Sequence, residues 1–233
     1  MRTSVIEEAI EPIVGAILRH PFVTGLADGS LEPAAFRRFL LQDGIFLGDF
    51  ARGLAITGAR AGEPADVRLL CGHAAEALEV ERELHDHLRD RLAIDEAEIA
   101  AAEPSPACLG YGSFLIRASS IGERADGLAA LAPCYLVYRR VGAELAASGS
   151  PDPAYADWIA TYDGDAFGAA VDALTEACDR ALAGIGAEAT ASARAHALTA
   201  ARYEWMFWES ALRDEVWGPA PALTRSSPDR TSG

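Results

Sequence analysis

The sequence predicts an all-α protein, built as a single-domain helical bundle. Alanine is abundant, β-branched residues are sparse, and no stretch alternates apolar and polar residues over the length of a strand. Such a composition favours helices, because alanine has the highest helix propensity and half-buried strands alternate with a period of two. The chain has 233 residues, half of them hydrophobic, which is enough for one large core.

Turn-forming residues mark the ends of the first predicted helices. His20-Pro21 ends the first, and the second begins at Pro33, a favoured first-turn position, after the turn Asp28-Gly29-Ser30. Gly62 and Pro64 separate the second helix from the third. The first three predicted helices therefore cover residues 3–19, 33–60 and 64–92.

The same signals divide the second half of the chain. Pro104-Ser105-Pro106 precedes the fourth predicted helix, the run 148–151 separates the fifth from the sixth, and Gly184 and Gly186 end the seventh. These five helices cover residues 107–121, 125–148, 152–161, 164–184 and 188–214. We expect one domain over residues 1–217 and a disordered tail over residues 218–233, which are rich in proline, serine and threonine.

Charge and motifs exclude several classes of protein. The net charge of -15 repels phosphate and anionic lipid, so we expect neither nucleic-acid nor membrane binding. No secretory signal and no apolar run of about 18 residues is visible, which favours a cytoplasmic protein. No P-loop or dinucleotide fingerprint suggests a cofactor, and we expect none. The four cysteines form no C-x-x-C pair and are expected to be free thiols: Cys71, Cys108, Cys134 and Cys178.

Two acidic residues lie on apolar helix faces. Asp43 interrupts an apolar stripe one turn after Phe39, and Glu204 lies between Ala201 and Trp208 on the inner face of the last helix. An isolated buried charge is costly, so each carboxylate needs a partner or a function. Two interpretations stay open: separate structural ion pairs, or two acids that meet in one pocket and take acid and base roles.

Cys134 and a set of aromatic residues extend this candidate pocket. Cys134 follows Pro133 on the inner face of the fifth helix, where it is either a small core residue or a reactive thiol. An aromatic pocket with few polar groups suits a flat heterocycle, although each aromatic residue alone is more typical of an ordinary core. The aromatic residues of the middle third are Tyr111, Tyr138, Tyr155, Trp158 and Tyr162.

The third helix offers an alternative metal site. Carboxylates and histidines at helical spacing can hold two metal ions inside a bundle. Here the Glu-x-x-His pattern is absent, and the residues lie among other charged side chains that are typical of a solvated face. The residues of this alternative are His73, Glu76, Glu79, Glu83, His85 and His87.

Five sequence blocks, in order, resemble those of the TenA/thiaminase II family. They span residues 20–208, nearly the whole chain. The blocks are His20-Pro21-Phe22-Val23 through Leu41-Gln42-Asp43; Pro104-Ser105-Pro106 with Tyr111; Ala132-Pro133-Cys134-Tyr135 with Tyr138 and Gly142; Tyr155 through Trp158 to Tyr162; and Tyr203-Glu204 with Phe207-Trp208.

This resemblance implies a haem-oxygenase-like helical fold without haem, assembled as a homotetramer. It also implies hydrolysis at the methylene carbon of an aminopyrimidine, with aminomethylpyrimidine or thiamin as substrate and hydroxymethylpyrimidine as the product used in thiamin salvage. Proteins of this family are often described as transcriptional regulators, but the sequence has no helix-turn-helix signal.

The resemblance also assigns roles to the polar residues. Cys134 corresponds to the nucleophile and Glu204 to the glutamate that moves protons. Asp43 corresponds to the aspartate that binds the amidine-like edge of the pyrimidine. The remaining substrate-binding positions are Phe46, Tyr111, Tyr138 and Tyr162.

One position departs from the family pattern, because Phe46 stands where a tyrosine is common, and Gly44 replaces a larger residue. The loss of a hydroxyl affects the expected substrate preference more than the reaction class. Two alternatives remain: a metal-dependent oxidase of the same fold, and a pyrimidine-binding protein without catalytic activity.

Overall fold

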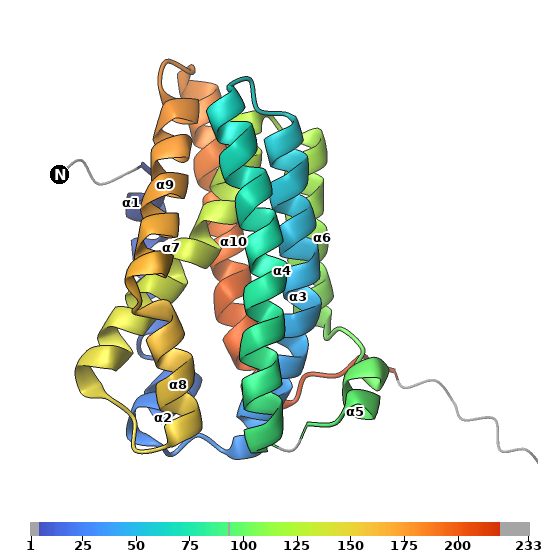
Figure 1. Cartoon of the computed structure of the whole chain (residues 1–233). Helices are drawn as coiled ribbons and strands as arrows, with labels where there is room; N and C mark the ends of the chain where they lie inside the picture. Colours follow the sequence, from blue (N-terminus) through green and yellow to red (C-terminus); the bar gives the residue numbers. More distant parts are fainter. Residues whose placement is uncertain (1–4, 93, 220–233) are drawn as a thin grey trace, which may run out of the picture.

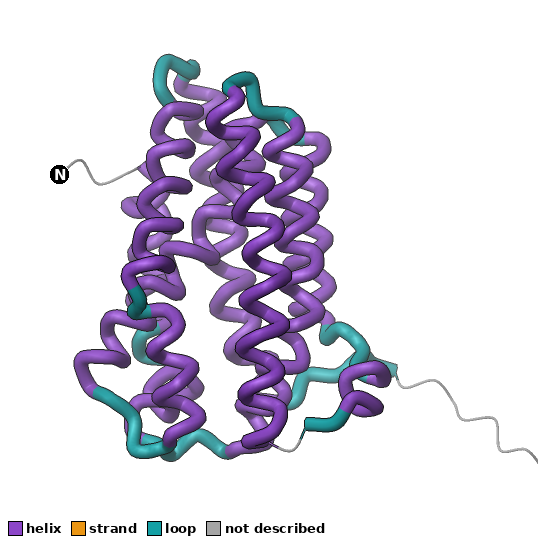
Figure 2. The backbone as a smooth tube through the Cα atoms, viewed as in Figure 1, coloured by secondary structure: helices purple, strands orange, loops and turns teal. Residues whose placement is uncertain are grey.

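The computed structural model describes residues 5–92 and 94–219, except the side chains of residues 80–91. In this part of the chain helices are joined by loops and there is no strand (Figure 2), which confirms the predicted all-α class. The helices are α1 Val5–Ile17, α2 Pro21–Asp28, α3 Pro33–Ala59, α4 Pro64–Leu92, α5 Glu96–Ala101, α6 Pro106–Ile121, α7 Arg124–Ser148, α8 Pro153–Tyr162, α9 Asp165–Leu182 and α10 Ala187–Arg213.

The eight predicted helices are all present, with ends that differ by a few residues. Two further short helices, α2 and α5, lie in segments for which the sequence predicted no helix. His20 starts α2 by accepting a hydrogen bond from the Phe22 N–H, and Gly29 ends it in the left-handed region at φ 75°. Asp95 caps α5 in the same way, through the Glu98 N–H. Both helices are too short for a repeating pattern of apolar residues to be recognised in the sequence.

The long helices pack side by side as a bundle (Figure 1). Helix α3 packs on α4 and α6, and α10 packs on α7 and α1. Helix α7 is buried along most of its length and continues through Pro133 without interruption. The core is therefore built around α7, and side chains on its inner face meet residues of several other helices.

An aromatic cluster holds α3, α8 and α10 together. Phe39 stacks on Trp208 with ring centroids 4.8 Å apart, and Trp158 meets Phe39 at 5.7 Å and 85°. Each stacked or edge-to-face pair contributes about 0.5–1.5 kcal/mol of stability beyond the contribution of the apolar area that it buries. Trp158 also contacts Tyr138 and Tyr162, so the cluster fixes the positions of two predicted site residues.

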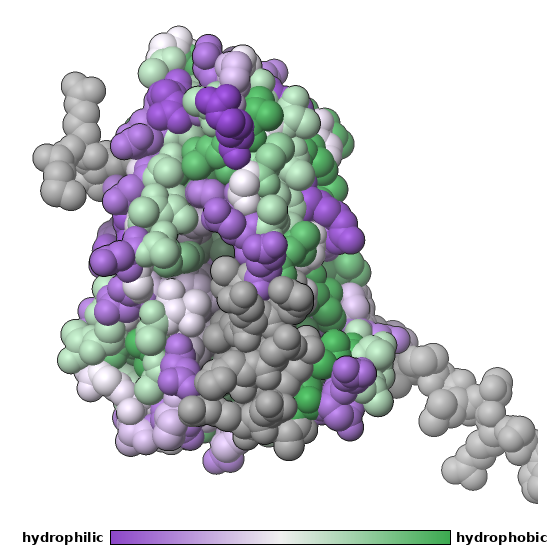
Figure 3. All heavy atoms as spheres, viewed as in Figure 1, coloured by the Kyte–Doolittle hydropathy of each residue, from purple (hydrophilic) through white to green (hydrophobic). Residues whose placement is uncertain are grey.

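Hydrophilic and hydrophobic residues are mixed on the surface. Hydrophilic side chains are spread over the face seen in Figure 3 and are not gathered at one end. None of the described helices is both long and apolar enough to cross a membrane.

Candidate active site

The predicted site residues come from five helices that meet at α7. Asp43 and Phe46 lie on α3, and Cys134 and Tyr138 lie one turn apart on α7. The other three residues are Tyr111 on α6, Tyr162 at the end of α8 and Glu204 on α10. Positions separated by more than 160 residues in the sequence therefore contribute to one site.

A cavity of about 470 Å³ lies at this meeting point. Its volume is within the range of about 300–1,000 Å³ that is typical of small-molecule sites. Five of the seven predicted residues line it: Asp43, Phe46, Cys134, Tyr138 and Tyr162. The other lining residues are Leu47, Phe50, His73, Glu76, Ala77, Tyr135, Thr161, Ala166, Phe167 and Ala170.

Glu204 and Tyr111 are not among the residues that line the cavity, but Glu204 lies beside Cys134, which does line it. The Tyr111 hydroxyl donates a hydrogen bond of 2.7 Å to Glu204 Oε1, and both side chains are buried. The Cys134 thiol is within hydrogen-bonding reach of the same carboxylate. Glu204 thus has two donors, one of which is a thiol that faces the cavity.

Burial and, to a smaller extent, the Asp43 charge raise the pKa of Glu204 to about 8, against the lowering effect of the Tyr111 hydrogen bond. A carboxyl group that titrates near neutral pH can both give and take a proton during one catalytic cycle. Only 3% of the surface of Asp43 is exposed, yet Asp43 lines the cavity. The two buried acids predicted from periodicity therefore lie in one site.

The Cys134 thiol is neutral in the free protein. Burial raises its pKa well above the usual value, and the charges of Glu204 and Asp43 raise it further. A thiol in this state attacks only after it has lost its proton, and Glu204 is placed to accept it. The pair therefore resembles a nucleophile with an adjacent general base.

Tyrosine and phenylalanine side chains form the walls near Cys134. Tyr138 and Tyr162 lie with ring centroids 4.8 Å apart, and Phe46 stacks on Tyr111 at 4.7 Å. Burial raises the pKa of Tyr138 and Tyr162 well above the usual value, so both hydroxyls remain protonated donors at neutral pH. Flat aromatic faces with a few donors match a heterocyclic ligand.

Gly142 allows α8 to approach α7 closely. A Cβ atom at this position would lie 2.8 Å from the backbone carbon and oxygen of Tyr162 and from its Cβ. Only glycine fits such an approach without displacing the end of α8. The sequence marked Gly142 only as part of a family block, and the structure shows its role in placing Tyr162.

Sequence reasoning missed the other end of the cavity. His73 was weighed only as a metal ligand, but its Nδ1 lies 3.1 Å from the Tyr135 hydroxyl. Tyr135 also lies against the rings of Phe50 and Phe167. An inward aromatic residue gives the same sequence pattern in a solid core and in a cavity wall, so no sequence signal could have identified these residues.

The predicted metal site is only partly covered by the structure. Glu83, His85 and His87 lie outside the residues whose side chains are described. Within the described side chains, no group of three histidine, cysteine, aspartate or glutamate residues is arranged to hold a metal ion. His73 and Glu76 instead line the cavity that contains Cys134.

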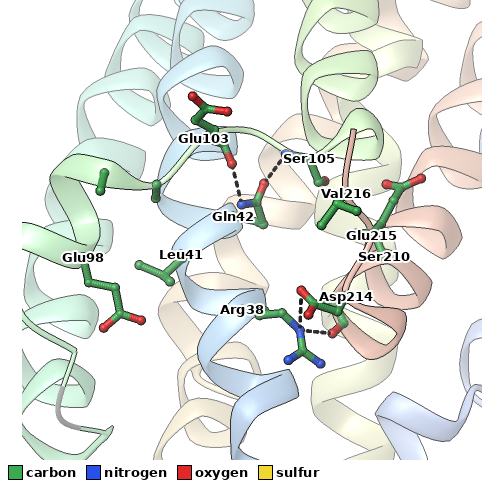
Figure 4. Close-up of a pocket in the computed structure, with 13 residues that line it drawn as sticks. Arg38, Leu41, Gln42, Glu98, Glu103, Ser105, Ser210, Asp214, Glu215 and Val216 are labelled. Atoms are coloured by element: carbon green, nitrogen blue, oxygen red, sulfur yellow. Dashed lines mark hydrogen bonds and ion pairs between the residues drawn. The ribbon is translucent and has the colours of Figure 1, made fainter. Parts of the chain in front are cut away.

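A second hollow, of about 380 Å³, lies between α3, α5 and the segment that follows α10 (Figure 4). Its polar groups are engaged in contacts between these elements. The Gln42 side chain donates to the Glu103 carbonyl at 3.0 Å and accepts from the Ser105 N–H at 2.7 Å. The Arg38 guanidinium donates to the Ala211 carbonyl at 2.9 Å. These bonds fasten the start of α6 and the end of α10 to α3, so we interpret this hollow as a structural joint.

Comparison with known sequences identifies the family. The model of the TENA/THI-4/PQQC family matches residues 7–214. An aminopyrimidine aminohydrolase of Halalkalibacterium halodurans is 32% identical over 212 residues, which are 90% of this chain and 95% of the relative. An aminopyrimidine aminohydrolase of Bacillus subtilis is 34% identical, with 85% of this chain and 84% of the relative covered.

Solved structures support the same assignment. A TenA homologue from P. horikoshii superposes with a TM-score of 0.82 at 26% identity, covering 89% of this chain and 96% of the other. A domain from Shewanella denitrificans with a haem-oxygenase-like fold gives a TM-score of 0.72 at 14% identity, covering 92% and 94%. The second match confirms the predicted haem-oxygenase-like fold. Together with the sequence matches, these likenesses show that the chain belongs to the TENA/THI-4/PQQC family.

Proposed function

We propose that this protein is an aminopyrimidine aminohydrolase of the thiaminase II type. It hydrolyses aminomethylpyrimidine or thiamin to hydroxymethylpyrimidine for thiamin salvage. The relatives named aminopyrimidine aminohydrolase support the reaction class. The observation that carries the proposal is the Cys134 thiol, which faces a cavity of suitable size while the carboxyl group of Glu204, hydrogen-bonded to Tyr111, lies behind it.

Cys134 and Glu204 carry out the chemistry in this proposal. Glu204 takes the thiol proton while the sulfur bonds to the pyrimidine carbon beside the one that bears the side chain. The bond between the methylene carbon and the leaving nitrogen then breaks. The amine released from aminomethylpyrimidine takes up a proton, whereas the thiazole of thiamin leaves as a neutral base. Water adds to the freed methylene carbon and gives up a proton, and the C–S bond breaks to restore the thiol. The sum is substrate plus water giving the alcohol plus the amine.

The remaining site residues bind and orient the ring. The Asp43 carboxylate accepts the hydrogen bond of the exocyclic amine at the edge of the pyrimidine. Tyr138, Tyr162 and Phe46 cover the ring faces, and Tyr111 holds Glu204 in place. The protein needs no cofactor in this scheme, and we further propose that it acts as a cytoplasmic homotetramer that does not bind nucleic acid.

The test is release of hydroxymethylpyrimidine by the purified protein from aminomethylpyrimidine and from thiamin, in buffer treated with a chelator. The proposal expects steady turnover of at least one substrate under these conditions. Binding without turnover would instead indicate a pyrimidine-binding protein, and activity that depends on added metal would indicate the metal-dependent alternative. Either of these results would overturn the proposed hydrolysis.

A further inference from the structure

The cavity extends beyond the residues that would hold a pyrimidine ring. Asp43, Cys134, Tyr138 and Tyr162 are the residues assigned to the ring, and the cavity is also lined by His73, Glu76, Tyr135, Phe167 and Ala170. A volume of about 470 Å³ is that of a site for a drug-sized ligand and exceeds what a single six-membered ring fills. The part lined by His73, Glu76, Tyr135 and Phe167 is called the outer chamber below.

Tyr135 connects Cys134 with the outer chamber. It follows Cys134 directly on α7, and its hydroxyl has a raised pKa because of burial first and of the nearby Glu76 carboxylate in addition. Its ring lies 5.6 Å from that of His73 and stacks at 6.1 Å on that of Phe167. A group attached to the methylene carbon beside Cys134 would therefore pass along Tyr135 into the outer chamber.

The described side chains of the outer chamber carry a negative charge. Burial lowers the pKa of His73, which leaves its imidazole neutral near pH 7. Glu76 is an exposed residue that lines the chamber, and none of the cavity-lining residues whose side chains the structure describes is a lysine or an arginine. A carboxylate beside aromatic faces attracts cations, through charge and through the π-electrons of the rings. The overall charge of -15 acts in the same direction.

We propose that the outer chamber receives the leaving group of the substrate, and that Glu76 makes the enzyme prefer aminopyrimidines whose leaving group is positively charged. This inference rests on the proposed function, because the proposed hydrolysis defines which part of the substrate is the leaving group. Glu76 is a specificity-determining residue in this account, and it takes no part in bond breaking.

The experiment compares two aminopyrimidines in three proteins. Thiamin carries a permanently cationic thiazolium as its leaving group, and N-acetylated aminomethylpyrimidine carries a neutral one. The ratio of their kcat/KM values is measured for the wild type, for Glu76→Gln and for Glu79→Gln. Glu79 is a matched control because it is an exposed acid on the same helix that does not line the cavity.

We expect Glu76→Gln to lower the cationic-to-neutral ratio by about two- to fivefold, the size of an interaction with an exposed carboxylate. Added salt should lower the ratio in the wild type and leave it unchanged in Glu76→Gln, because salt screens the exposed charge. An equal ratio in the wild type and both variants would overturn the inference.

A binding measurement separates this inference from the proposed function. The dissociation constants of the same two compounds are measured in Cys134→Ser proteins with and without Glu76→Gln. If the wild type hydrolyses neither aminomethylpyrimidine nor thiamin, the proposed function fails, but a binding preference for the cation that depends on Glu76 still supports the chamber. If turnover is seen and neither kcat/KM nor binding depends on Glu76, the chamber assignment alone is wrong.

Discussion

The hydroxyl of Tyr111 donates a hydrogen bond of 2.7 Å to Oε1 of Glu204, and both groups are buried behind Cys134. This bond joins α6 to α10 and favours the ionised form of a carboxyl group whose pKa burial has raised to about 8. The balance between the two effects determines the fraction of molecules in which Glu204 is ionised and can act as a base at neutral pH.

Tyr111→Phe should therefore raise the pKa of Glu204 further and move the acidic limb of the pH profile of kcat/KM to higher pH. At pH 7 the activity should fall by about 10- to 100-fold, within the range of general acid–base effects. The measurement is the pH profile of hydroxymethylpyrimidine release. Tyr155→Phe is the matched control, because the buried Tyr155 hydroxyl donates to the Leu31 carbonyl on another part of the core. A pH profile unchanged by Tyr111→Phe would contradict the proposed role.

Glu204→Gln should abolish activity but stabilise the fold. The folded pKa of about 8 lies above the ordinary value of 4.5, so the folded protein holds a proton that the unfolded chain has lost at intermediate pH. The wild type therefore loses stability as pH rises from about 4.5 to about 8, by up to roughly 5 kcal/mol. Glutamine does not titrate and therefore removes this loss. The gain in the free energy of unfolding over the wild type, measured with urea, should be larger at pH 8 than at pH 5. A gain independent of pH would contradict the raised pKa.

Gly142→Ala should lower stability by about 1–3 kcal/mol, the usual cost of overpacking. The added Cβ would overlap the end of α8, and the displaced Tyr162 should raise KM more than it lowers kcat. Gly72→Ala is the control, because Gly72 lies within α4 with no atom within 4 Å of the added carbon. That change should be neutral or stabilising. Similar losses in both variants would show that close approach to Tyr162 is not the cause.

Phe46→Tyr should restore a hydroxyl to the cavity wall. Phe46 lines the cavity and stacks on Tyr111, so a tyrosine can keep the same stacking. One additional hydrogen bond to the substrate is worth about 0.5–1.5 kcal/mol, which corresponds to a KM two- to tenfold lower with kcat little changed. Steady-state kinetics on aminomethylpyrimidine and on thiamin measures the effect. An unchanged KM for both substrates, in a variant as stable as the wild type, would show that this position does not affect substrate binding.

The sequence predicted the long helices and the two buried acids from physical patterns. Asp43 and Glu204 stood out because each interrupts an apolar face, and the structure places both at the site. The roles of Cys134, Tyr138 and Tyr162 came from the family resemblance, since periodicity alone does not separate a reactive cysteine from a core cysteine.

Other features depended on contacts between distant segments. Helix α2 depends on the cap by His20, whose other ring nitrogen lies 3.0 Å from Glu209 on α10. The partnership of Tyr135 with His73 joins residues 62 positions apart. Contacts of this kind follow from how the helices pack, which a single sequence does not specify residue by residue.

The central claim is that Cys134 is the nucleophile, and the most direct test compares the wild type with Cys134→Ser and Cys71→Ser. Cys71 is an exposed thiol that does not line the cavity, so it controls for the loss of a cysteine. The measurement is hydroxymethylpyrimidine release from aminomethylpyrimidine at saturating substrate. The account predicts that Cys71→Ser keeps wild-type turnover and that Cys134→Ser loses it by at least about 100-fold. Equal turnover by Cys134→Ser and the wild type would contradict the account.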